Sequence, residues 1–250
     1  MHFSPEFLFI VFIVMYIAEV YGSMIGGGSF LIQSVLIALG VPPHIAVAHD
    51  VAGANGTNIG GALVFYKYKQ IRYELVLWWI PGLIIGALLG VKLLVSVEPW
   101  VIEKSLGFFA LFGLIYMLFL KKEQGVKEQV LPRKWHYLSI PFSFIVGVYF
   151  GFSSAGTGIL TSFLLVSFFG LTFIQSLAAR KVIHFIPMLV AALSYMYLDL
   201  LYLDLWLVMF SAGFLAGLTG SFLSLKIGNE RLKWIFMSVV AILALWLLFK

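Results

Sequence analysis

The chain has 250 residues, of which 62% are hydrophobic and 11% are charged, and it carries a formal net charge of +5. A water-soluble domain of this size does not tolerate so apolar a surface, so the composition indicates a polytopic membrane protein. The sequence contains no cysteine, which excludes disulfides, thiolate metal sites and nucleophilic thiols. The modest positive charge is typical of short membrane loops and gives no sign of nucleic-acid binding.

The first apolar segment, Pro5–Gly40, is too long to cross a membrane as one helix. At 1.5 Å per residue it would measure roughly 52 Å, against a hydrocarbon core of about 30 Å. The consecutive glycines Gly26–Gly28 interrupt it, and Ser29 is placed to cap a helix that restarts after them. We therefore predict two helical arms, at about 6–22 and 29–40, that meet at a break inside the membrane.

Full spans and a second broken pair follow in chain order. The first half continues with spans at about 44–66, 74–95 and 101–120. The second half predicts arms at about 136–150 and 158–170 and spans at about 174–197, 204–225 and 231–249. The chain is thus divided into a first transmembrane repeat (1–120), a basic cytoplasmic linker (121–134) and a second transmembrane repeat (135–250).

The two halves match at a fixed offset. Gly158 follows Gly28 by 130 positions, and the same offset relates Asp50 to Arg180 without a gap. A chain that repeats itself in this way is expected to consist of two copies of one structural unit.

Charges in the loops indicate that the two copies have opposite orientations. The turn with Lys69 and Arg72 is basic and therefore cytoplasmic by the positive-inside tendency, whereas the equivalent turn carries Asp199 and Asp204. We predict an all-α polytopic membrane protein of two inverted-topology repeats, each with a broken-helix arm pair and three full transmembrane spans. In transporters built this way, broken helices form a site near the membrane midplane.

The two breaks predict an anion site, because free amide groups in the first turn of a helix attract anions. The expected donors are Gly27, Gly28 and Ser29 in the first break and Gly156, Thr157 and Gly158 in the second. Unpaired backbone groups are costly inside a membrane, which favours a cavity here. Close packing is the alternative use of small residues, and we prefer it for Gly82, Gly86 and Gly90, which are spaced four apart.

Ionisable and amide side chains inside the spans are further candidates, because a charge in the bilayer is costly and usually has a partner or a function. For Asp50 and Arg180, a structural ion pair explains the burial as well as a role in transport does. His184 lies four residues after Arg180 and shares its helix face. Asn55 and Asn58 offer amide donors to a ligand, although hydrogen bonds between helices explain them almost as well.

No metal or catalytic site stands out in the sequence. His44 and His49 are five residues apart and lie on different helix faces, which argues against a metal pair. No set of nucleophile and base has a recognisable spacing, so we expect neither a cofactor nor enzymatic activity. An anion channel and an intramembrane enzyme are the alternatives to a carrier.

Four segments carry a family resemblance: Gly26–Phe30, Leu39–Ala48, Gly156–Gly158 and Arg180–Phe185. Together they resemble the TauE/SafE family of sulfite-exporter-like permeases, over nearly the whole chain. The resemblance implies a carrier of inverted repeats in the cytoplasmic (inner) membrane that moves sulfite, sulfoacetate or a related organosulfonate. The chain departs from the family pattern at His49-Asp50, where Thr-Ser is frequent, and at His184, where Asn is frequent.

The resemblance also identifies Lys181 as the lysine common after the second break. We predict that Lys181 supplies a positive charge to the anion, that Asp50 holds Arg180, and that access alternates around a midplane site. Coupling to protons or sodium, and formation of a homodimer, stay open. The residues expected to bind the substrate are Gly26, Gly27, Gly28, Ser29, His49, Asp50, Asn55, Asn58, Gly156, Thr157, Gly158, Arg180, Lys181 and His184.

Overall fold

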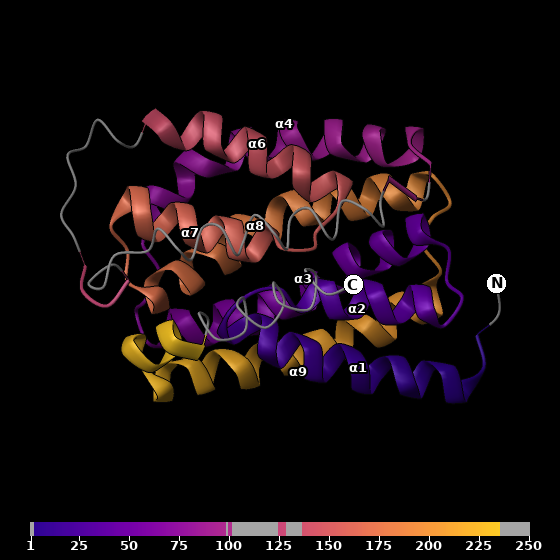
Figure 1. Cartoon of the computed structure of the whole chain (residues 1–250), viewed down its shortest axis with the longest axis horizontal. Coiled ribbons are helices and arrows are strands. Elements are labelled where there is room, and N and C mark those ends of the chain that lie inside the picture. The colour runs from indigo at the N-terminus through magenta and orange to yellow at the C-terminus, as the bar shows by residue number, and fades with distance from the viewer. Residues whose placement is uncertain (1–2, 99, 102–124, 129–136, 236–250) are drawn as a thin grey trace, which may run out of the picture.

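A computed structural model of the chain describes residues 3–98, 100–101, 125–128 and 137–235 (Figure 1). Helices account for the regular structure in these ranges, and the ranges contain no strand. The helices are α1 (Pro5–Met24), α2 (Gly28–Ala38), α3 (Pro43–Lys67), α4 (Tyr73–Ser96), α6 (Ser139–Phe152), α7 (Thr157–Phe169), α8 (Phe173–Tyr197) and α9 (Leu203–Ile227). The predicted all-α fold is thus confirmed for the described part of the chain.

The predicted arms and inner spans agree with these helices to within three residues at each end. The predicted spans 101–120 and 231–249 and the linker 121–134 lie mostly outside the described residues. Among the described helices, α1, α4, α8 and α9 are long and apolar enough to cross a membrane. Helix α3 has the same length as α8 but is less apolar, and most of its residues are buried in the protein.

The backbone repeats at the offset that the sequence predicts. Helices α3 and α8 span 43–67 and 173–197, and α4 and α9 begin at 73 and 203. Two turn residues other than glycine have a positive φ, Lys69 at 53° and Asp199 at 56°, and they too are 130 positions apart. The two halves therefore share local geometry even where their residue types differ.

The helices of each half pack mainly on helices of the other half. Helix α4 packs on α6 and α8, and α9 packs in the equivalent way on α1 and α3. Figure 1 shows α4 with α6 along one edge and α1 with α9 along the opposite edge. Helices α3 and α8 contact each other in the middle, so their facing side chains are enclosed by protein.

Glycines form the seams between these helices, as predicted for Gly82, Gly86 and Gly90. A methyl group at Gly86 would lie 2.7 Å from the backbone nitrogen of Val148 on α6, closer than real carbon contacts come. On the other edge of the bundle, Gly56 and Gly60 of α3 lie against carbonyl groups of α9. Small residues thus bring the backbones into contact, which is the usual basis of helix association in membranes.

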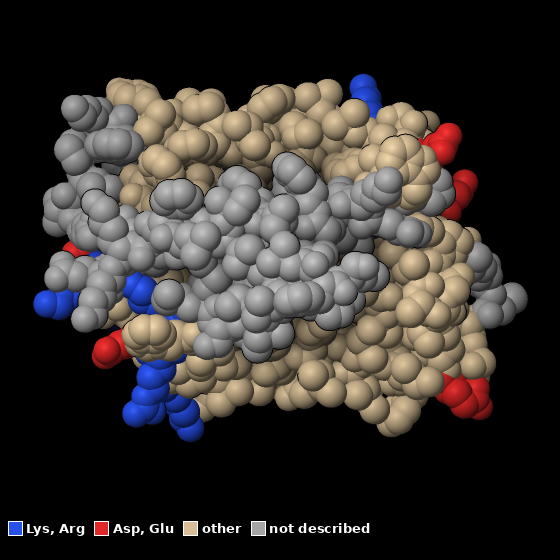
Figure 2. Space-filling model, in the orientation of Figure 1, with Lys and Arg blue, Asp and Glu red and all other residues tan. Residues whose placement is uncertain are grey.

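Charge is distributed unevenly along the long axis of the molecule. In Figure 2, most visible Lys and Arg side chains gather at one end and the opposite end carries mainly Asp and Glu. The described residues visible between the two ends are uncharged. Exposed Leu, Ile, Phe and Trp side chains occur along the long helices. This arrangement fits a protein whose helices cross a bilayer, with charged side chains at the two ends and apolar side chains between them.

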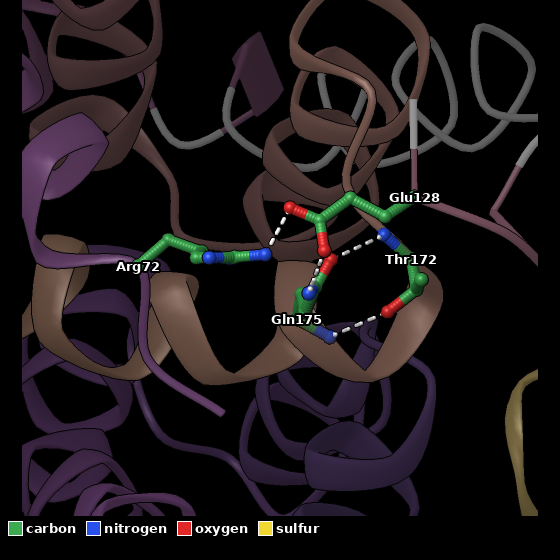
Figure 3. A network of polar contacts seen from close by, with 4 residues as sticks. All are labelled: Arg72, Glu128, Thr172 and Gln175. Carbon is green, nitrogen blue, oxygen red and sulfur yellow. Dashed lines mark hydrogen bonds and ion pairs between the residues drawn. The ribbon is translucent and has the colours of Figure 1, made fainter. Parts of the chain in front are cut away.

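A polar network connects Glu128 with Arg72 and with the first turn of α8 (Figure 3). Glu128 accepts hydrogen bonds from Gln175 (2.8 Å) and from Arg72, with which it also forms an ion pair. Gln175 belongs to a capping box with Thr172 that begins α8. The pKa of the Glu128 carboxyl is lowered from its usual value. The hydrogen bond from Gln175 is the main cause, and Arg72 contributes less. The network therefore supports this end of α8 near neutral pH and weakens in acid as the pH falls through that lowered pKa.

The glycine seam between α4 and α6 gives a first prediction. Gly86→Val should lower the free energy of unfolding by about 1–3 kcal/mol, because the added side chain meets the Phe144 carbonyl and the Val148 amide. Thermal unfolding of the purified protein in detergent measures the effect. The control is Ile85→Val, since Ile85 on the same turn is 57% exposed. An equal loss of unfolding free energy in the two variants would contradict the close contact between α4 and α6 at Gly86.

Candidate functional site

The first break separates α1 from α2 at a point where only glycine is unstrained. Gly26 and Gly27 have φ of 103° and 84°, in the left-handed region that side chains disfavour. The Gly26 N–H still donates to the carbonyl of Gly22 (2.8 Å), so α1 is closed normally. Helix α2 begins at Gly28, so Gly28 and Ser29 are its first helical residues, one position earlier than expected.

The second break has a similar backbone and different hydrogen bonding. Gly156 has φ of 82° and precedes α7, which begins at Thr157. The Thr157 amide donates to the carbonyl of Ser154 (3.1 Å), and the Thr157 hydroxyl donates to the same oxygen (2.6 Å). The expectation that the Thr157 amide is free to bind an anion is therefore wrong, because a local turn already uses it.

The two breaks touch each other. A methyl group at Gly26 would lie 3.1 Å from the carbonyl carbon of Gly158, and one at Gly158 would lie 3.5 Å from the Cα of Gly26. The same methyl groups would lie 2.7 Å and 2.6 Å from Nη1 of Arg180. The Arg180 guanidinium therefore rests against both breaks, in space that exists because both residues lack a side chain.

Side chains of other helices satisfy carbonyl groups near the breaks. Arg180 donates from Nη2 to Gly22 (2.8 Å), and the Tyr195 hydroxyl donates to Gly151 (2.6 Å). The Tyr149 hydroxyl donates to the carbonyl of Ala155 within the second break itself. Because lipid offers no hydrogen bonds, these contacts make an interrupted backbone tolerable in the interior of a membrane protein.

A cavity of about 40 Å³ lies beside the two breaks. The predicted site residues that line it are Gly26, Gly27, Gly28, Ser29, Asn58, Thr157, Gly158, Arg180, Lys181 and His184. Gly156, Asn55, Asp50 and His49 do not line it. The remaining lining residues, which we did not predict, are Glu19, Gly22, Ala54, Thr57, Phe150, Ser154 and Met188. The structure thus gathers ten of the fourteen predicted residues around one space.

Two basic side chains of α8 reach this cavity, and both are almost completely buried. Arg180 bonds to the Gly22 carbonyl and, at 3.4 Å, to the Ser162 hydroxyl, while Lys181 donates to the Ser23 hydroxyl (2.9 Å). All of these partners are neutral. The partners therefore orient the two cations without cancelling their charge.

Glu19 is the main residue that sequence reasoning missed. It is buried, lines the cavity, and interacts electrostatically with Lys181 and Arg180. A methyl group at Gly28 would lie 2.7 Å from Oε1 of Glu19, so the glycine at the start of α2 makes room for this carboxylate. An acidic residue deep in the first apolar segment was the available signal. With two cations and one carboxylate, the charged wall of the cavity is net positive when all three are ionised.

The predicted ion pair between Asp50 and Arg180 is wrong. Oδ2 of Asp50 accepts hydrogen bonds from Gln33 (2.9 Å) and Ser154, while Arg180 extends toward Gly22. Two residues at equivalent positions of two repeats have similar surroundings within their own repeat. Their side chains need not point toward each other. The relationship in sequence therefore did not imply contact.

The other predicted side chains have identifiable partners. His184 lies 2.9 Å from the Thr161 hydroxyl, and Asn58 donates to the sulfur of Met188 (2.9 Å). His49 lies away from the cavity, where Nε2 accepts from the Tyr202 amide (2.9 Å). Because Nε2 is an acceptor, Nδ1 carries the proton and donates to a carbonyl one turn earlier. Asn55 is buried, and its side-chain oxygen has no hydrogen-bond partner among the described residues.

The contacts of Arg180 give a second prediction. Arg180→Met should destabilise the protein by about 1–3 kcal/mol, because it removes the hydrogen bonds from the guanidinium to Gly22 and Ser162 and leaves Glu19 without one of its two neighbouring cations. Combined with Glu19→Gln, the loss should be smaller than the sum of the two single losses, since Glu19 and Arg180 interact. Combined with Asp50→Asn, the losses should add to within about 0.5 kcal/mol. Thermal unfolding of the three single and two double variants measures these losses. If Asp50→Asn instead rescued the stability of Arg180→Met, the result would support the ion pair between Asp50 and Arg180.

Comparison with known proteins places the chain among membrane transporters. The family described as sulfite exporter TauE/SafE matches residues 11–247. A probable membrane transporter protein of Haemophilus influenzae is 26% identical over 74% of this chain and 72% of its own length. The probable membrane transporter proteins YjnA of Bacillus subtilis and YfcA of Escherichia coli K12 are 25% and 24% identical, over 91% and 98% of this chain and 95% and 91% of their own lengths.

The family match and the match to YfcA extend through both halves of the chain, including both breaks and α8, which carries Arg180 and Lys181. The family match and the apolar helices together make this a multi-pass membrane transporter. The chain belongs to the sulfite exporter TauE/SafE family.

Proposed function

We propose that this protein is a secondary carrier of a small sulfur-containing anion, with its binding site between the two glycine breaks. One observation carries the proposal: the N-terminal turns of α2 and α7, Arg180 and Lys181 converge on one buried cavity. Helix N-termini hold partial positive charge, and the cations Arg180 and Lys181 beside them outnumber the one carboxylate, Glu19, when all three are ionised. Such a site favours an anion over a cation or a neutral solute.

The size of the cavity favours a compact substrate. A volume of about 40 Å³ exceeds the space for one water molecule but leaves little room for a long organic chain. Sulfite fits this description best, while sulfoacetate or a related organosulfonate requires the cavity to widen during transport. The family name, sulfite exporter, supports the same substrate class.

We further propose that the two halves are inverted repeats and that access alternates around the cavity. Three observations support this arrangement. Equivalent helices of the two halves share one offset in sequence, α4 and α9 each pack on helices of the other half, and basic side chains are concentrated at one end. In carriers of this type, one repeat moves against the other around a fixed site. The alternative, an anion channel, is distinguished by flux that does not saturate with anion concentration.

Lys181 gives the binding prediction. Sulfite, sulfate, thiosulfate, sulfoacetate and taurine are screened for an increase in the unfolding temperature of the purified protein. A ligand present at 100 times its dissociation constant stabilises the folded state by about 2.7 kcal/mol. Lys181→Met should abolish the response while leaving a cooperative transition, because it removes a full charge from the cavity wall.

The matched control is Lys92→Met, since Lys92 is exposed on α4 and away from the cavity. An unchanged ligand response in Lys181→Met would assign binding to the backbone and hydroxyl donors alone. No response of the unmodified protein to any of the five anions, together with no uptake into vesicles, would reject the carrier proposal.

The inverted arrangement predicts the sidedness of three turns. Because the chain has no native cysteine, single Cys replacements of Lys69, Asp199 and Lys226 can be labelled with an impermeant thiol reagent in whole cells. We expect external labelling at Asp199 alone, and labelling of all three positions after the cells are permeabilised. Labelling of Lys69 and Asp199 from the same side would exclude inverted repeats.

A further inference from the structure

A second polar cluster lies behind the wall of the cavity, around Asp50 of α3. Asp50 is completely buried, and its Oδ2 accepts from Gln33 of α2 (2.9 Å) and from Ser154 in the second break. Gln33 also donates to the Ser154 hydroxyl (2.7 Å), so the three side chains form a closed set. The Ser29 hydroxyl at the start of α2 also interacts with the carboxylate. The cluster therefore joins both broken helix pairs to one carboxylate.

No basic side chain of the described residues forms an ion pair with Asp50. Arg180 and Lys181 are hydrogen-bonded elsewhere, to Gly22 and Ser23. The titratable groups that interact with Asp50 are Glu19 from α1 and Tyr195 from α8. Neither supplies a positive charge, and an ionised Glu19 opposes a negative charge on Asp50.

An isolated ionised carboxylate is expensive to bury, and binding of one proton removes that expense. The hydrogen bonds from Gln33 and Ser154 offset part of it in the ionised form. The two protonation states of Asp50 therefore differ in how strongly the carboxylate holds Ser154. Ser154 also lines the cavity, so it connects Asp50 to the wall of the cavity through one hydrogen bond.

We propose that Asp50 is a proton-binding site that couples proton movement to anion transport. The proposal rests on the carrier function proposed above. Asp50 takes one proton from water on one side of the membrane, forming an O–H bond on the carboxylate, and releases the same proton to water on the other side. With the proton bound, Ser154 loses its charged acceptor, and the segment between α6 and α7 is freed to move.

The donors around Asp50 favour a proton over a sodium ion. A sodium ion would need several oxygen atoms directed at one point, as hard cations do in proteins. Around Oδ2 the structure instead directs an amide N–H of Gln33 and the hydroxyl hydrogen of Ser154. A dependence of transport on sodium is therefore an outcome that contradicts the proposal.

The test uses the full-length protein in vesicles and methanesulfonate, an organosulfonate with a fixed single charge at every working pH. Two activities are measured: exchange of the anion at equal pH on both sides, and accumulation driven by an imposed pH gradient. The unmodified protein should perform both. Asp50→Asn should keep the exchange and lose the accumulation, because an amide cannot bind and release the proton.

The matched control is Asp199→Asn, an identical change at an exposed turn, which should keep both activities. Equal accumulation by Asp50→Asn and the unmodified protein would overturn the proposal. Accumulation driven by a sodium gradient and indifferent to the pH gradient would overturn it as well.

A second measurement does not depend on the transported anion. Infrared difference spectra of the purified protein between acidic and alkaline buffer should contain a band of a protonated carboxyl group that Asp50→Asn lacks and Asp199→Asn keeps. Identical spectra of Asp50→Asn and the unmodified protein would show that Asp50 does not titrate. If no anion exchanges at all, the carrier proposal fails, and the infrared result alone decides whether Asp50 binds a proton.

Discussion

The contact between the two glycine breaks is the constraint on which the rest of this structure depends. Gly26 and Gly158 approach so closely that a methyl group on either would meet the other backbone or the Arg180 guanidinium. Interrupted helices leave backbone groups that lipid cannot satisfy. The breaks are therefore enclosed by α3 and α8, and side chains such as Arg180 and Tyr195 complete their hydrogen bonds.

The outer helices make that enclosure possible. Glycine seams let α4 approach α6, and α9 approach α3, until the backbones touch. Because each of these contacts joins one half of the chain to the other, helices of both halves together enclose the breaks. Close packing without large side chains also leaves the apolar side chains of the long helices free to face lipid.

Because the helices enclose the cavity, the charges of Arg180, Lys181 and Glu19 in its wall act more strongly than they would at an exposed surface. In an interior with a low dielectric constant, a net positive wall attracts an anion far more strongly than the same charges would in water. In the carrier proposed above, Glu19 moderates that attraction, so that the anion can leave the site as well as bind to it. Asp50 lies one layer behind, joined to the same wall through Ser154. The proposed anion site and the proposed proton site are thus joined by one hydrogen-bonded segment between α6 and α7.

The sequence alone determined the helical class, the positions of the breaks and the internal offset, because these depend on apolar length, glycine and local turn chemistry. It also identified Arg180, since a charge within an apolar span stands out, and the family resemblance identified Lys181. Only the tertiary structure decided that Glu19 faces them and that Asp50 bonds to Gln33 and Ser154. Those choices depend on which way a side chain points between helices far apart in the chain, and an offset between repeats carries no information about direction.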